Sequence, residues 1–238
     1  MNKQSNSYTL IYIIGLVIIV GTALAWIATA LKPEQTRNTD ADKMKQILAA
    51  VHCPETNRAS VTQTFNTCIT GIVVDEDGNQ IQGKEAFDID VANQSKITDT
   101  SNRLLPVYIY HDSSVGTKYI LPMYGQGLWG PIWGYIAINN DGSTIYGAYF
   151  SHQGETPGLG AEIEKPDFQN RFIDKRLFKD GDYKPVTVVK AGQHPIGNED
   201  YVDGISGGTI TSKGVAAMLA NCLAPYKNYL ENINRTED

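Results

Sequence analysis

A run of 24 uncharged residues near the amino terminus constrains the fold of this chain more than any other feature. It extends from Tyr8 to Leu31, and twelve of its residues are Leu, Ile or Val. As an α-helix it would be about 36 Å long at ~1.5 Å per residue, and a hydrocarbon core is ~30 Å thick. Tyr8, Tyr12 and Trp26 lie toward its ends, where aromatic belts form in membrane proteins. We therefore predict a transmembrane helix over residues 8–31.

A cleaved signal peptide is the alternative interpretation of this segment. Ala28, Thr29 and Ala30 resemble a cleavage site made of small residues. The apolar run is longer than the ~7–15 residues that are usual for a signal peptide, which favours a retained anchor. The orientation of the helix is weakly marked, because Lys3 precedes the run and Lys32 follows it.

The composition excludes several classes of protein. The 238 residues include 20 Lys and Arg against 26 Asp and Glu, so the net charge is −6. Binding to nucleic acid is not expected, because phosphate contacts require clustered basic residues. Hydrophobic residues make up 42% of the chain and charged residues 19%, which is typical of a folded protein rather than a disordered one.

The cysteines and histidines indicate neither a disulfide scaffold nor a metal site. Three cysteines are too few for a disulfide scaffold. Cys53 and Cys68 could pair in an oxidising compartment or remain free thiols, and Cys222 falls on the apolar face of a predicted helix. The four histidines are His52, His111, His152 and His194. Their spacing is not that of metal ligands, so no metal is expected.

Strand signals dominate the middle of the chain. Aromatic and β-branched residues recur there between Gly, Pro and Asn breaks. Asn140-Asp141-Gly142 is typical of a hairpin turn between two such runs. The predicted strands lie within residues 71–74, 104–112, 118–125, 133–154 and 186–190.

Helical spacing of apolar residues is found in three places after the anchor. These are residues 41–51, residues 166–180 and the segment that begins near Ser212, which Pro225 interrupts. We therefore predict an α+β fold, in which one N-terminal transmembrane helix precedes a mixed sheet and helix domain. The chain divides into an N-terminal segment, the anchor, a polar linker and one domain, over residues 1–7, 8–31, 32–40 and 41–238.

The first segment that could carry chemistry is Asp203 to Ser212, with the sequence DGISGGTITS. Its glycines allow a ligand to approach the backbone, and Ser212 is a plausible N-cap of the following helix. The N-terminus of a helix attracts phosphate, so the segment reads as a phosphate site with a hydroxyl inside it. An ordinary glycine turn with a Ser or Thr cap remains the alternative. The segment is neither a P-loop nor a dinucleotide-binding fingerprint.

Two further glycine-rich segments have the composition of ligand-binding loops. In residues 152–160, Glu155 and Thr156 supply an acceptor and a hydroxyl, and Leu159 could cover a flat ring. In residues 125–131, Trp129 could stack on a flat ring or fill a core. A surface turn and a core tryptophan are the corresponding alternatives.

Together, in this order and behind one anchor, these segments resemble the C subunit of the bacterial sodium-translocating NADH:quinone reductase, an FMN-binding domain family. The ETPGLG signature of that family stands at Glu155–Gly160, and its GxGLWG stretch stands at Gly125–Gly130. Its flavinylation motif, D-x-x-(S/T)-G-A-(S/T), stands at Asp203–Thr209, with Gly208 in place of the usual Ala. The resemblance covers nearly the whole chain.

The resemblance implies FMN attached covalently through a phosphoester to Thr209, with Thr211 as the rival acceptor. No catalytic residue is expected in this chain. The residues expected around the cofactor come from all three segments: Thr209, Ser206, Gly207, Gly208, Thr211, Asp203, Glu155, Thr156, Gly158, Leu159, Gly160, Leu128 and Trp129.

The resemblance also implies a function, a location and partners. The chain would be an electron carrier in a six-subunit, sodium-pumping NADH:ubiquinone oxidoreductase of the bacterial inner membrane, without an NADH site of its own. It would be anchored in lipid, with the FMN domain on the periplasmic side and the N-terminus inside, and a flavin transferase would attach the FMN. The G subunit of the related ferredoxin:NAD oxidoreductase is the runner-up, and a flavin-free binding module on a membrane anchor is the third hypothesis.

Overall fold

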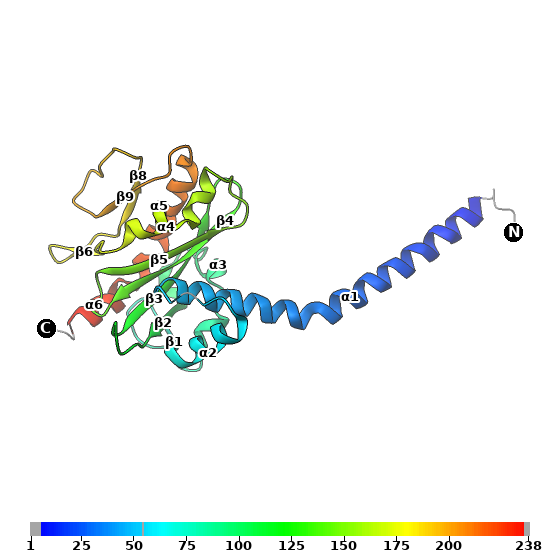
Figure 1. The fold of residues 1–238 in the computed structure, drawn as a ribbon, viewed down its shortest axis with the longest axis horizontal. Helices are drawn as coiled ribbons and strands as arrows, with labels where there is room; N and C mark the ends of the chain where they lie inside the picture. Colours follow the sequence, from blue (N-terminus) through cyan, green and yellow to red (C-terminus); the bar gives the residue numbers. More distant parts are fainter. Residues whose placement is uncertain (1–5, 54, 236–238) are drawn as a thin grey trace. The chain divides into compact units, whose positions relative to one another are not determined.

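The computed structural model describes residues 6–53 and 55–235, which divide into two units between Lys43 and Met44 (Figure 1). The first unit consists of most of helix α1, Asn6–Ala49. By length and composition, α1 is the one helix among the described residues that could cross a membrane. It contains the whole segment predicted to do so.

The predicted linker over residues 32–40 is wrong in its conformation, because α1 continues through it. Pro33 lacks a backbone donor and its ring crowds the preceding turn, but the polar residues after it support the helix. Arg37 forms an ion pair with Glu34 at 3.0 Å, and the Thr36 hydroxyl donates to a carbonyl four residues earlier. The separate helix predicted over residues 41–51 is therefore the end of α1.

A five-stranded antiparallel sheet with the order β1-β2-β3-β4-β5 forms the centre of the second unit. Each strand pairs with its neighbour in the sequence, so the sheet is a meander (Figure 1). The predicted hairpin turn is confirmed between β4 and β5, where Asp141 accepts the amides of Ser143 and Thr144. The strands are β1 (Ile69–Val74), β2 (Leu105–Tyr110), β3 (Lys118–Gln126), β4 (Pro131–Asn139) and β5 (Ile145–His152).

Two hydrophobic clusters cover the two faces of this sheet. Successive side chains of a strand point to opposite faces, so neighbouring residues belong to different clusters. Leu121, for example, belongs to one cluster and Ile120 to the other. The larger cluster includes helix α5 (Thr209–Leu223), and the smaller includes the end of α1 and helix α2 (Arg58–Cys68). The α+β fold is thus confirmed, with the sheet between two layers of helix.

The helix predicted over residues 166–180 is only partly present. Helix α4 (Pro166–Gln169) and a 3-10 turn at Asn170–Phe172 form its start. Asp174 then adopts a φ of 64°, in the left-handed region, which ends the helical path. The chain continues instead into strand β6 (Phe178–Lys179).

The other elements of the second unit are short. The strand predicted over residues 186–190 is confirmed as β8 (Thr187–Val189), and Pro225 separates α5 from α6 (Lys227–Arg235) as predicted. Cys53, Cys68 and Cys222 are free thiols, and Cys222 is buried. The remaining elements are α3 (Val91–Gln94), β7 (Asp182–Tyr183), β9 (Tyr201–Asp203) and 3-10 turns at Ala86–Asp88, Thr100–Asn102, Gly160–Glu164 and Ala224–Tyr226.

Candidate cofactor site at the start of helix α5

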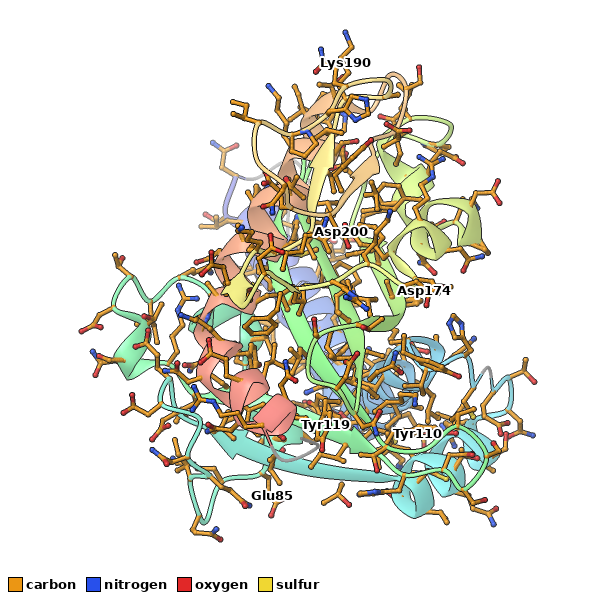
Figure 2. The ribbon with its side chains drawn as sticks, turned by 90° about the vertical axis from the view of Figure 1, so that its left-hand side faces the viewer. Glu85, Tyr110, Tyr119, Asp174, Lys190 and Asp200 are labelled. Atoms are coloured by element: carbon orange, nitrogen blue, oxygen red, sulfur yellow. The ribbon has the colours of Figure 1, made fainter. Side chains whose placement is uncertain are left out.

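A cavity of about 410 Å³ lies where strands β8 and β9 end and helix α5 begins. The two strands are parallel, so their carboxyl ends meet at one edge, as in the ligand sites of parallel sheets. Figure 2 shows Lys190, which follows β8, at the opposite end of the domain from Glu85. The cavity is lined by Val188, Val189, Lys190, Ala191, Gln193, Gly204, Ile205, Ser206, Gly207, Thr209, Ser212 and Lys213.

The charge of this lining is positive although the whole chain is acidic. Of the described residues that line the cavity, Lys190 and Lys213 are cationic and none is a carboxylate. Lys213 lies four residues after Thr209 on α5, so both lie on one face of the helix. Such a cavity suits an anionic ligand such as a phosphate. The Thr209–Lys213 spacing was available in the sequence but Lys213 was not predicted.

Helix α5 begins at Thr209, three residues earlier than the predicted N-cap at Ser212. The N-cap prediction is therefore wrong, because Gly208 occupies that position. Ser212 lies in the first turn, where its hydroxyl accepts the Ile205 amide at 2.9 Å. Thr209 is exposed at the N-terminus of a 15-residue helix, the end that favours negative charge.

The two threonines that competed as acceptors have different environments. Thr209 is exposed and lines the cavity. The Thr211 side chain is 1% exposed, and its hydroxyl donates to the Glu155 carboxylate at 2.5 Å. Of the two, Thr209 alone therefore has a hydroxyl that a reagent in solution can reach.

Glu155 joins the three segments that the sequence singled out. It is 4% exposed, and its Oε1 accepts the Trp129 amide at 2.8 Å while its Oε2 accepts the Thr211 hydroxyl. Both carboxylate oxygens are thus occupied by the protein. The structure gives this predicted ligand residue an internal position, which no local sequence pattern reveals.

Gly127 and Gly160 allow the backbone to come close to the Glu155 carboxylate. A Cβ atom at Gly127 would be 2.5 Å from Glu155 Oε1. A Cβ atom at Gly160 would collide with Glu155 Oε2 and with the Thr211 hydroxyl. Gly127 and Gly160 are therefore required by packing around one buried carboxylate.

Replacing Gly160 with alanine is expected to destabilise the domain by ~1–3 kcal/mol, because the new methyl overpacks the Glu155–Thr211 contact. Gly154→Ala is the matched control: its Cβ would meet nothing within 4 Å, so a change below ~0.5 kcal/mol is expected. Thermal unfolding of the two full-length variants in detergent compares them. Equal stabilities would contradict the close packing at Gly160.

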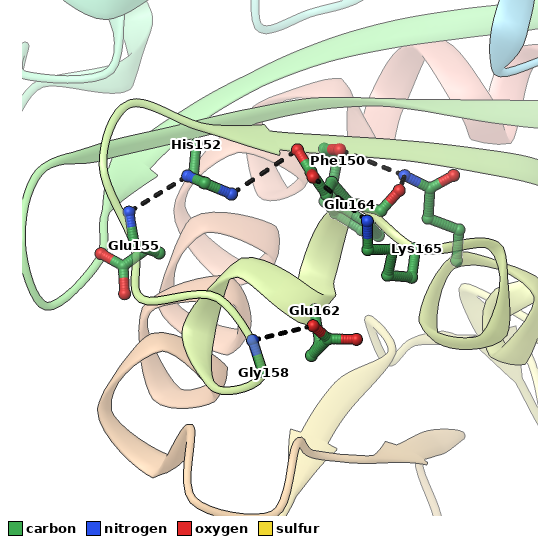
Figure 3. A network of polar contacts seen from close by, with 8 residues as sticks. Phe150, His152, Glu155, Gly158, Glu162, Glu164 and Lys165 are labelled. Atoms are coloured by element: carbon green, nitrogen blue, oxygen red, sulfur yellow. Dashed lines mark hydrogen bonds and ion pairs between the residues drawn. The ribbon is translucent and has the colours of Figure 1, made fainter.

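Polar contacts fix the shape of the loop that follows β5 (Figure 3). His152 Nδ1 accepts the Glu155 amide at 3.1 Å, and its Nε2 lies 3.5 Å from a carboxylate oxygen of Glu164. The Gly158 amide donates to Glu162 at 3.0 Å. His152 Nδ1 is therefore the unprotonated nitrogen, and the imidazole holds the backbone of Glu155 in place.

Three of the residues predicted in the other two segments lie on the surface and do not line the cavity. Leu128, Trp129 and Leu159 have exposed side chains, and Trp129 is 69% exposed. Trp129 does not fill a core, so of the two interpretations of this residue the structure excludes the core tryptophan. Leu159 lies against Gly207, whose φ is 76° and whose Cβ would be 2.6 Å from Leu159 Cδ2.

The other predicted residues divide between exposed and enclosed positions. Those with exposed positions are Thr156, Gly158, Asp203, Ser206 and Gly207, whereas Gly160 and Gly208 are buried.

Hydrogen bonds from Arg171 and Gly192 hold Asp203, the last residue of β9. Arg171 Nη1 donates to the Asp203 carbonyl at 2.8 Å, and the Asp203 carboxylate accepts the Gly192 amide at 3.2 Å. A second cavity of about 460 Å³ includes Arg171, Lys165 and Ser206. Arg171 was not predicted, because its partner is a backbone carbonyl 32 residues away. No cluster of three or more His, Cys, Asp or Glu within the described ranges could hold a metal ion.

Comparison with known proteins identifies the family of this chain. Residues 127–224 match the FMN-binding domain family, and this range includes the segments at residues 152–160 and 203–212. The C subunit of the Na(+)-translocating NADH-quinone reductase of Vibrio alginolyticus is 34% identical over 230 residues, which cover 90% of this chain and 89% of that protein. The corresponding protein of Yersinia pestis is 34% identical over 232 residues, or 90% and 87% of the two chains. The chain belongs to this C-subunit family.

Solved structures of the family have the same fold. The C subunit from Parabacteroides distasonis has a TM-score of 0.76 and 45% identity, with 84% of this chain and 96% of that chain covered. Shewanella oneidensis NqrC has a TM-score of 0.66 at 22% identity, covering 83% and 99%, and shows the fold alone. The resemblance deduced from the three segments is thus confirmed.

Proposed function

We propose that this chain is an FMN-carrying electron-transfer subunit of a sodium-translocating NADH:quinone reductase. The observation that carries the proposal is the contrast between Thr209 and Thr211. Thr209 presents an exposed hydroxyl beside a cationic cavity at a helix N-terminus, whereas the Thr211 hydroxyl is buried against Glu155. Thr209 is therefore our proposed site of covalent attachment.

The cavity has the chemistry that FMN requires. Its volume of about 410 Å³ is within the range of ~300–1,000 Å³ that is usual for ligand sites. Lys190 and Lys213 would neutralise the phosphate, and the N-terminus of α5 would add ~0.3–1 kcal/mol of dipole stabilisation at an exposed position. Val188 and Ile205 supply apolar surface for a flat ring. FMN, when bound, supplies reversible electron transfer.

Attachment at Thr209 is a substitution at phosphorus. The Thr209 Oγ1–P bond forms while a phosphoanhydride bond in the flavin-nucleotide donor breaks, and the leaving phosphate takes the electron pair. The hydroxyl proton is lost, so the chain gains the mass of one FMN less one water. We assign this step to a separate flavin transferase, as the resemblance of the three segments to the family implies.

Three loops would surround the bound group. Ser206 and Gly207 belong to the acceptor segment, while Leu159 and Trp129 are exposed on the neighbouring loops. Gly208 stands where the family motif has Ala. A Cβ there would lie 3.1 Å from Ile205 Cγ2, closer than an ordinary van der Waals contact, so the space around Gly208 is already filled without the methyl group.

The same proposal extends to location and partners. Helix α1 would anchor the chain in the inner membrane, with residues 41–238 on the periplasmic side. The carrier would relay electrons from NADH-derived centres toward quinone within a complex of six subunits. The G subunit of the ferredoxin:NAD oxidoreductase is not favoured, because the relatives described above are named as the C subunit of the sodium-translocating enzyme.

Expression of the full chain with and without an active flavin transferase tests the proposed function. We expect an intact-mass gain of one FMN less one water only with the transferase, and a flavin absorbance that dithionite bleaches and air restores. A colourless chain of unchanged mass, beside a second substrate that the same transferase loads, would overturn the proposal. It would favour a flavin-free binding domain on a membrane anchor.

A further inference from the structure

The carboxylate of Glu155 contacts both of the other segments at the site. It accepts the Trp129 amide on one oxygen and the Thr211 hydroxyl on the other, at 2.8 and 2.5 Å. Its side chain is buried, and Gly127 and Gly160 leave room for it. A buried carboxylate with both oxygens bonded in this way is fixed in direction as well as in place.

The backbone of Glu155 is fixed by a separate contact. His152, at the end of β5, accepts the Glu155 amide through Nδ1 (Figure 3). The central sheet therefore holds the residue at its backbone, while its side chain reaches two other segments. Glu155 links the sheet, the exposed Trp129 loop and the first turn of α5.

The contact with Thr211 lies two residues from the proposed acceptor. Thr209 and Thr211 belong to the same turn of α5, and the Ser212 amide already bonds to the Gly208 carbonyl there. Fixing the Thr211 side chain therefore fixes the turn, and with it the direction in which Thr209 presents its hydroxyl. The same bond makes Thr211 itself inaccessible.

We propose that Glu155 is the positioning residue for flavin attachment. It acts through Thr211 and the Trp129 amide and aligns Thr209 Oγ1 for attack on the phosphorus of the flavin donor, without itself contacting the flavin. The inference rests on the proposed function and deepens it. Alignment matters here because displacement of a reacting atom by ~1 Å can cost about 10²-fold in rate.

Two substitutions test the hydrogen bonds of the Glu155 side chain: one preserves its size and one removes it. Glu155→Gln keeps an oxygen for the Trp129 amide and offers an amide group to Thr211, whereas Glu155→Ala removes both contacts. Val61→Ala is the matched control for lost stability. Val61 is 2% exposed in α2 and belongs to the cluster on the other face of the sheet from α5.

The first test is made on the full chain in detergent without flavin. Hydrogen exchange, followed by mass spectrometry, reports on peptides that cover residues 125–131 and 203–212. In Glu155→Ala we expect exchange at least about tenfold faster in both peptides, because both lose a bond to a buried anion. Glu155→Gln and Val61→Ala should stay within about threefold of the wild type there. Unchanged exchange in Glu155→Ala would overturn the positioning role.

The second test is the rate of flavin attachment by a purified transferase at saturating flavin donor, followed by intact mass. We expect Glu155→Ala to be loaded at least about tenfold more slowly, with Glu155→Gln restoring most of the rate and Val61→Ala close to wild type. Wild-type loading of folded Glu155→Ala would overturn the inference alone. Failure of the wild type to load would overturn the proposed function, and the exchange test would still decide whether Glu155 fixes the turn.

Discussion

Thr209→Ala is expected to abolish covalent attachment of FMN to the full chain co-expressed with a flavin transferase. The substitution removes the exposed hydroxyl, and the next threonine along is buried against Glu155. Loss of the nucleophile leaves no route to the phosphoester, so the loaded fraction should fall from near complete to background. Intact mass and in-gel flavin fluorescence both measure this fraction.

Thr209→Ser is the matched control for that substitution. Serine keeps the hydroxyl and loses only a methyl group, so attachment should be retained. Folding is checked by comparing the thermal unfolding of Thr209→Ala with that of the wild type, since the exposed Thr209 side chain makes no cap hydrogen bond and its loss should change stability little. Persistent loading of Thr209→Ala would contradict the site, and would require Thr211 to leave Glu155 before it could react.

The sequence predicts the segment that we propose as the acceptor, but it does not predict the direction of the side chains in that segment. Glycines on both sides of Ser206 permit several paths for the backbone, and residues 209–212 include three hydroxyl side chains. A helix start at Thr209 and one at Ser212 are locally equivalent, since Ser, Thr and Gly all serve as caps. In the structure, Thr211 in the first turn of α5 bonds to Glu155, which comes from a loop 56 residues away. That long-range contact has no local signature.

The secondary structure was likewise predictable where local sequence determines it and not where other parts of the chain do. Strands were predictable where a turn limits them, as at Asn140–Gly142. The linker over residues 32–40 was not recognised as helix, because polar residues and Pro33 lower the local signal while an already formed helix needs little more to continue. The helix over residues 166–180 fails at Asp174, where the Arg176 amide turns instead toward the carboxylate of Asp200.

A buried arginine far from the proposed flavin site is expected to have the largest effect on stability. Arg103 is 5% exposed, and its guanidinium donates to the carbonyls of Ile97 and Asn221 at 2.8 and 2.9 Å and to the side chain of Asn221 at 2.9 Å. Asn221 is in the last turn of α5, where carbonyls lack partners within the helix. Arg103 thus satisfies the end of the helix whose beginning carries Thr209.

Arg103→Met is expected to destabilise the domain by about 3 kcal/mol, because it removes the hydrogen bonds that a buried, charged guanidinium donates to the part-buried carbonyls of Ile97 and Asn221. For a domain of this size, that corresponds to a fall of about 6–12 °C in Tm. Arg235→Met is the matched control. Arg235 is exposed and, among the residues that the structure describes, forms a 3.7 Å surface pair with Glu231, so its loss should cost less than ~1 kcal/mol. Thermal unfolding of both full-length variants, followed by circular dichroism, makes the comparison. Similar Tm values would show that water or a neighbouring side chain satisfies the end of α5 without Arg103, and that the two ends of the helix are held independently.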